Sequence, residues 1–151
     1  MIVGVDPGND TGVAVFKDKK LVELHTFKRY EFILWFQENA INIKLLVLEN
    51  SKLQSHIFTA RNIKKELTEE VKRKVYGKMG RNVGEGDGFC EVIEEMCKFY
   101  KIECKNVSPL AKGKKITHET FKDFVPYYNK QTNQHKRDAA QVVMRFNYEY
   151  L

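Results

Sequence analysis

Four residues of types that bind divalent metal ions lie at the ends of predicted strands and on the last predicted helix. Asp6 and Glu49 each end a short apolar run, so both are expected at the ends of strands. His135 and Asp138 are three residues apart, and on a helix this spacing places both on one face. A helical pair is half of a metal site, and the two strand-end acids would supply the other half. We therefore expect these four residues to converge.

The four donor types suit hydrolysis of a phosphodiester. Two divalent ions about 4 Å apart can activate a water molecule, neutralise the phosphate and stabilise the leaving oxygen. Hard ions such as Mg²⁺ prefer the carboxylates of Asp6, Glu49 and Asp138, and Asp6 could bridge both ions. His135 is a softer ligand that suits Mn²⁺, or it could act on the water or the leaving group. We expect two Mg²⁺ ions per site, with Mn²⁺ able to substitute.

Each of these residues also has a simpler interpretation when it is taken alone. Asp6 could cap its own turn, and Glu49 could be a salt-bridged strand end. His135 and Asp138 could be the exposed first turn of the last helix, where the helix dipole favours an anionic Asp138. The combination, in this order along the chain, favours a catalytic group.

The apolar pattern predicts the scaffold that would position these residues. Three strands that open the chain should form an antiparallel meander, and a strand without alternation suits a buried parallel position. The predicted elements are strands at 1–5, 13–16 and 21–27, a helix at 30–40, a strand at 44–48, a helix at 89–100, a strand at 102–107, a helix begun by Thr117, and a last helix from His135 nearly to Leu151. This order indicates one α/β domain over residues 1–151, with a mixed five-stranded sheet flanked by helices.

Residues 50–88 interrupt this regular pattern. A dense mixture of charges at 64–74 predicts an exposed helix, and five glycines between 77 and 88 predict the most mobile segment of the chain. The segment holds no P-loop motif. Its glycine run at 84–88 does not follow a convincing strand, which argues against a dinucleotide site.

The overall composition indicates the kind of partner and the cellular compartment to expect. The net charge is +6 and the pI is about 9.1, which suggests a polyanionic partner. The sequence shows no membrane-length apolar run and no secretory leader, so a cytoplasmic protein is expected. Cysteines stand at 90, 97 and 104, an odd number without a Cys-x-x-Cys pair, which is typical of reduced thiols.

The motifs resemble a known family of nucleases. The opening Gly4-Val5-Asp6-Pro7-Gly8, followed by Thr11-Gly12-Val13-Ala14, resembles that of RuvC-type Holliday junction resolvases, which have the ribonuclease H-like fold. Glu49 matches the strand-end glutamate of that family, and His135-Lys136-Arg137-Asp138-Ala139 matches its closing helix. The resemblance implies a metal-dependent endodeoxyribonuclease that makes paired nicks in four-way junctions during recombination or repair. Asp6, Glu49, His135 and Asp138 would be its catalytic, metal-binding residues, in a bacterium or a phage-infected cell.

The resemblance also implies residues that contact DNA. The loop containing Lys112, Lys114 and Lys115 is similar to the junction-binding segment of the family, and Arg81 would be a further phosphate contact. Phe58 is the nearest equivalent of an aromatic residue that stacks at the junction, although it stands at a different distance from the glutamate. The long, charged segment at 50–88 departs from the bacterial enzymes and indicates a phage or otherwise divergent member.

A four-way junction has two-fold symmetry, so paired nicking calls for two active sites, and a homodimer supplies them. The apolar stripe of the helix predicted at 89–100 is the candidate interface.

Three alternatives remain open from the sequence. Another nuclease of the same fold could act on structured RNA or on branched or flapped DNA. A kinase or ATPase domain could use residues 6–12 as a phosphate loop, but that fold normally needs two such domains. A basic nucleic-acid-binding protein without catalysis would have no cutting activity to lose when the acidic group is neutralised.

Overall fold

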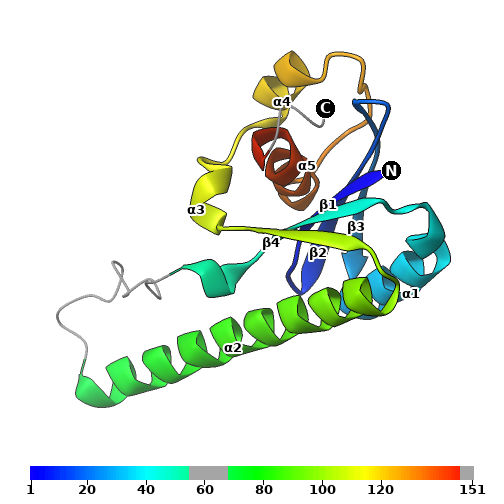
Figure 1. The fold of residues 1–151 in the computed structure, drawn as a ribbon. Coiled ribbons are helices and arrows are strands. Elements are labelled where there is room, and N and C mark those ends of the chain that lie inside the picture. The colour runs from blue at the N-terminus through cyan, green and yellow to red at the C-terminus, as the bar shows by residue number, and fades with distance from the viewer. Residues whose placement is uncertain (55–67, 147–151) are drawn as a thin grey trace.

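The computed structural model describes residues 1–54 and 68–146 (Figure 1). The strands are β1 (Ile2–Asp6), β2 (Asp10–Lys17), β3 (Lys20–Lys28), β4 (Leu45–Glu49) and β5 (Glu103–Val107). The helices are α1 (Arg29–Asn39), α2 (Glu69–Phe99), α3 (Pro109–Lys112), α4 (His118–Phe124) and α5 (Gln134–Phe146), with short 3₁₀ turns η1 (Ala40–Asn42) and η2 (Ser51–Leu53).

The five strands form one mixed sheet in the order β3-β2-β1-β4-β5. The first three strands pair antiparallel, whereas β4 pairs parallel to β1 and β5 pairs parallel to β4. This confirms the predicted architecture of an antiparallel meander followed by parallel strands. It also places β1 and β4, the two strands that end in Asp6 and Glu49, side by side.

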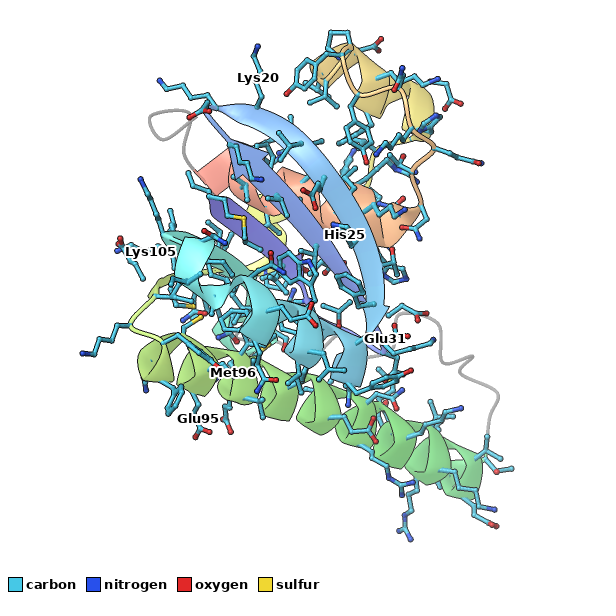
Figure 2. The ribbon with its side chains drawn as sticks, turned by 90° about the vertical axis from the view of Figure 1, so that its right-hand side faces the viewer. Lys20, His25, Glu31, Glu95, Met96 and Lys105 are labelled. Atoms are coloured by element: carbon cyan, nitrogen blue, oxygen red, sulfur yellow. The ribbon has the colours of Figure 1, made fainter. Side chains whose placement is uncertain are left out.

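Helices cover both faces of the sheet. On one face, Val5 and Leu48 belong to a buried cluster with side chains of α1 and α2, and Figure 2 shows these two helices next to each other on that face. On the other face, Val47 packs in a second cluster with α4 and α5. Because β4 is covered on both sides, its sequence is apolar without alternation.

The glycine-rich stretch at 77–88, where the sequence predicted the most mobile segment, is helical. It lies inside α2, a helix of 31 residues. The second half of α2 is anchored by four buried side chains: Phe89, Cys90, Ile93 and Cys97. The first half extends past the edge of the sheet (Figure 1).

Three features support the glycine-containing half of α2. Thr68 caps the helix, since its hydroxyl accepts a hydrogen bond from the Val71 N–H at 3.4 Å. Glu69 and Glu70 stand in the first turn, where the helix dipole favours acids. They also pair with Lys72 and Lys74 at helical spacing. These local contacts, and continuity with the buried half, offset a glycine cost of about 0.5–1 kcal/mol per residue.

The last helix begins one residue earlier than predicted. α5 starts at Gln134, so Asp138 lies at the start of the second turn rather than in the first, and no acid stands in the first turn. The expectation that the helix dipole favours Asp138 is therefore wrong. Residues 147–151, which the prediction included in this helix, lie outside the described residues.

The structure also describes the three cysteines, the start of α4 and the character of the helices. Cys90 and Cys97 are buried free thiols and Cys104 is a partly buried one, as predicted. Thr117 caps α4 as predicted, with its hydroxyl accepting a hydrogen bond from the Thr120 N–H at 3.2 Å. Among the described helices, none combines the length and the apolar character needed to cross a membrane.

Candidate active site

Two of the predicted acids stand at equivalent positions on neighbouring parallel strands. β1 and β4 pair in a register that sets Val5 beside Leu48, so Asp6 and Glu49 come next, at the carboxyl ends of their strands. In open α/β sheets, this edge is where ligands bind. Side chains alternate along a strand, and Val5 and Leu48 face α1 and α2. Asp6 and Glu49 therefore point to the opposite face, which α5 covers.

Two glycines allow α5 to lie directly on the strands. A Cβ atom at Gly4 would overlap the carbonyl oxygen of Ala139, and one at Gly12 would overlap the carbonyl oxygen of His135. Ala139 itself is fully buried. Gly12 is also the residue paired with Asp6 across β1 and β2. The small residues thus set the first turn of α5 beside the Asp6 carboxylate.

Two of the predicted ligands, His135 and Asp6, lie close together. The Nδ1 atom of His135 lies 3.8 Å from Oδ2 of Asp6, which makes an ion pair when the imidazole is protonated. The His135 side chain is 46% exposed and that of Asp6 is 15% exposed. The pair therefore has a largely buried acid on the sheet and an imidazole that solvent can reach.

Asp10, four residues after Asp6, pairs with Lys28. Its carboxylate accepts a hydrogen bond from the Lys28 ammonium, and this contact holds the pKa of Asp10 below its usual range. Asp10 and Lys28 face each other at the ends of β2 and β3.

Asp138 is almost completely buried, with 3% of its surface exposed. Its Oδ1 atom accepts a hydrogen bond of 2.6 Å from the side-chain amide of Gln134, one helical turn earlier. Sequence reasoning placed Asp138 in the catalytic group but did not identify Gln134 as its partner. The i, i+4 spacing on a predicted helix was the available signal.

The chain after Glu49 is fixed by Asn50, a residue that sequence reasoning missed. Asn50 is 2% exposed, and its N–H donates to the carbonyl oxygen of Val107 at 2.8 Å. Its side chain accepts from the Lys52 N–H at 3.0 Å and donates to Oδ1 of Asn106 at 3.1 Å. The Cys90 thiol reaches the carbonyl oxygen of Glu49 at 3.8 Å. These bonds connect the end of β4 to β5 and α2.

Glu94 on α2 completes this network. Its carboxylate accepts hydrogen bonds from the Lys52 ammonium at 2.9 Å and from the Asn106 amide at 2.7 Å. Burial alone would raise the pKa of Glu94, but these two donors outweigh it, and the pKa is lowered. Glu94 is therefore an ionised anchor for the turn that follows Glu49.

An open groove of about 620 Å³ begins at the same edge of the sheet. It is lined by Pro7 and Gly8, by Arg29, by η2 and by α2 residues between 79 and 87. Arg29 is fixed there, since its Nε donates to the Gly8 carbonyl at 3.4 Å and its guanidinium lies 5.3 Å from the centre of the Phe89 ring. The groove lies next to the residues that follow Asp6 and Glu49, but none of the four predicted donors lines it.

The chemistry of the four donors fits a hard divalent ion, because three of them are carboxylates and one is an imidazole. In the parts of the chain that the structure describes, no three His, Cys, Asp or Glu side chains are already gathered closely enough to hold an ion. The backbone thus brings the four residues to one edge of the sheet. To hold a metal ion, the four side chains would have to move closer together.

The predicted DNA contacts are distributed over two regions. Lys114 and Lys115 are exposed in the loop between α3 and α4, and Lys112 is the last residue of α3. This loop is tied to α5, because the Gln141 amide donates to the Lys114 carbonyl at 3.2 Å. Arg81 is exposed on α2, on the other side of the sheet. Phe58 lies outside the described residues.

None of the protein-family models or curated proteins compared with the chain matches it. Among solved structures, T. thermophilus RuvC in complex with Holliday junction substrate has a similar fold, with a TM-score of 0.53. The match covers 95% of this chain and 90% of that chain, at 12% sequence identity. The similarity confirms the predicted ribonuclease H-like fold.

Proposed function

We propose that the chain is a metal-dependent endonuclease that resolves four-way DNA junctions by paired nicks. The observation that carries the proposal is the placement of Asp6 and Glu49 at the ends of adjacent parallel strands, beneath the first two turns of α5, which carry His135 and Asp138. The net charge of +6 suits a polyanionic substrate. The structural neighbour, which is similar over most of both chains, was determined with a Holliday junction.

Asp6 would hold metal from the centre of the site, and Glu49 and Asp138 would each complete one side. Bound Mg²⁺ or Mn²⁺ would activate a water molecule and stabilise the charge on the phosphate and the leaving oxygen. The exposed imidazole of His135 would serve either as a ligand or as the group that takes a proton from water. The close packing of α5 on the sheet keeps this pair of helical residues aligned with the strand-end acids.

The basic loop would position the substrate. Lys112, Lys114 and Lys115 would contact phosphates, and such contacts fix the register of DNA without reading its sequence. The hydrogen bond from Gln141 to the Lys114 carbonyl attaches this loop to the helix that carries His135 and Asp138. A phosphate held by the loop would therefore be bound next to the helix that carries two of the proposed catalytic residues.

A homodimer would supply the second active site that symmetric nicking needs. The exposed side of α2 offers an apolar surface for this contact, with Phe99 79% exposed and Val92 and Tyr100 also exposed. Figure 2 shows Met96 and Glu95 on the same helix, beside α1. Val92, Met96 and Phe99 also line a groove of about 460 Å³.

The first test is cleavage of a labelled four-way junction, compared with matched duplex, flap DNA and structured RNA, with Mg²⁺ or Mn²⁺. We expect paired symmetric nicks in the junction from the wild-type protein. Asp6→Asn should abolish cutting and retain junction binding. Asp10→Asn is the matched control, because it makes the same change four residues away in an acid that pairs with Lys28, and it should cut normally.

The other outcomes have defined meanings. Equal cutting of flap DNA or RNA would replace junction resolution with a broader structure-selective nuclease activity. If neither ion supports cutting of any substrate, the catalytic proposal is wrong and a basic binding protein remains.

A further inference from the structure

Arg137 is held at several points, all of them close to the candidate site. Its Nε donates to the Ile116 carbonyl at 2.9 Å, and its Nη1 donates to the carbonyl and hydroxyl oxygens of Thr132 at 3.0 and 3.1 Å. Its Nη2 donates to Oε1 of Gln134 at 2.9 Å. Thr132 is itself buried and hydrogen-bonded to Nδ1 of His118 at 2.8 Å. The guanidinium therefore has one defined position.

This contact determines which way the Gln134 amide points. A guanidinium can only donate hydrogen bonds, so the atom of Gln134 that faces Arg137 has to be the oxygen. The amide nitrogen then faces Asp138 and donates to its Oδ1 at 2.6 Å. The Gln134 amide thus links the guanidinium of Arg137 to the carboxylate of Asp138.

We propose that Gln134 and Arg137 are positioning residues for the metal site, and that they orient the Asp138 carboxylate for metal binding. This inference rests on the function proposed above. A hydrogen bond to Oδ1 fixes the plane of the carboxylate, and so fixes the direction in which Oδ2 points. Carboxylates that bind metal are commonly held in this way, and loss of the supporting partner typically weakens metal affinity about 10- to 100-fold.

The same arginine connects the metal site to the basic loop. Ile116, whose carbonyl Arg137 binds, directly follows Lys114 and Lys115. Arg137, together with the Gln134 amide, thus links the loop proposed to contact phosphates with the carboxylate proposed to bind metal. The arrangement couples the position of the substrate backbone to the orientation of Asp138.

The test measures Mn²⁺ binding by the DNA-free protein, from the loss of the electron paramagnetic resonance signal of free Mn²⁺. Gln134→Ala and Arg137→Met should each weaken Mn²⁺ affinity about 10- to 100-fold. Lys136→Met is the matched control, because it removes the same charge from the neighbouring residue and should leave the affinity unchanged. Saturating Mn²⁺ should restore cutting by Gln134→Ala, whereas it should not restore cutting by Asp138→Ala.

Asp6→Asn separates the failure of this inference from the failure of the proposed function. If the wild type binds Mn²⁺, Asp6→Asn does not, and Gln134→Ala binds as the wild type does, then the positioning role is refuted while the proposed function stands. If the folded wild type binds no Mn²⁺, the proposed function and the inference are both refuted. Should Arg137→Met not fold, as judged by circular dichroism, Gln134→Ala alone decides the result.

Discussion

Replacing Gly12 with alanine tests whether the close approach of α5 to the sheet sets the geometry of the site. The added methyl group would overlap the carbonyl oxygen of His135, well inside the closest distance of about 3.0 Å that real Cβ atoms keep. Backbone atoms lie on both sides of this contact, so α5 has to move away from β2. We expect a loss of about 1–3 kcal/mol in the free energy of unfolding, as in other overpacked cores. A shift of about 1 Å at the site would reduce the cutting rate about 10²-fold.

The matched control makes the same substitution where there is room for it. Gly88 lies in α2, and outside its own stretch of helix backbone no described atom lies within 4 Å of the place that an added methyl group would take. Gly88→Ala should therefore stabilise the helix by up to about 1 kcal/mol and leave cutting unchanged. Urea unfolding followed by circular dichroism gives the stabilities, and cutting of the four-way junction is measured well below the unfolding midpoint of each variant. Wild-type stability and wild-type cutting in Gly12→Ala would refute the role given to this contact.

Two further predictions concern charged residues, namely Glu94 and the lysine pair Lys114 and Lys115. The hydrogen bonds from Lys52 and Asn106 lower the pKa of Glu94 in the folded protein. Their stabilisation is therefore fully present above the unfolded glutamate pKa of about 4.3, and it is lost as the pH falls through the lower pKa of the folded state. The difference in unfolding free energy between the wild type and Glu94→Gln should therefore shrink below pH 4, and a difference independent of pH would contradict this. Replacing Lys114 and Lys115 with alanine should weaken junction binding and reduce its logarithmic salt dependence by about 2 units, whereas Lys20→Ala, at the opposite end of the sheet, should change neither.

The strands, and their division into an antiparallel meander and later parallel strands, could be predicted from sequence because each signal reports a local environment. The unbroken apolar run before Glu49 reflects a strand buried on both faces, and the structure shows both faces of β4 covered. The two strand-end acids then follow from simple geometry. Adjacent parallel strands end at the same edge, so Asp6 and Glu49 had to lie near each other once β1 and β4 were paired.

The conformation of residues 77–88 could not be predicted in the same way. Glycine lowers the helix propensity of each position, but it does not report contacts made elsewhere along the helix. The decisive contacts are the buried side chains near residues 89–97 and the cap at Thr68, which lie on either side of the glycines. Because helix formation is cooperative, the contacts at the two ends of α2 keep the glycine-containing stretch between them helical.

The supporting residues of the site were missed for a different reason. Arg137 binds the carbonyl of Ile116, which is 21 residues away, and Asn50 binds Asn106, which is 56 residues away. Side-chain spacing on one element cannot reveal such partners. Of these supporting residues, only Gln134 could have been found from local spacing, because it lies one helical turn before Asp138.

The glycines of the opening motif have a physical role that the resemblance alone did not supply. Asp6 pairs with Gly12 across the sheet, and Gly4 lies two residues before Asp6 on the same face. Both glycines meet backbone atoms of α5, so each fixes the height of His135 above the strand that carries Asp6. A larger side chain at either position would separate the imidazole from the carboxylate without altering any of the four donors. The proposed metal-binding geometry therefore depends on the lack of a side chain at positions 4 and 12 as much as on the acids themselves.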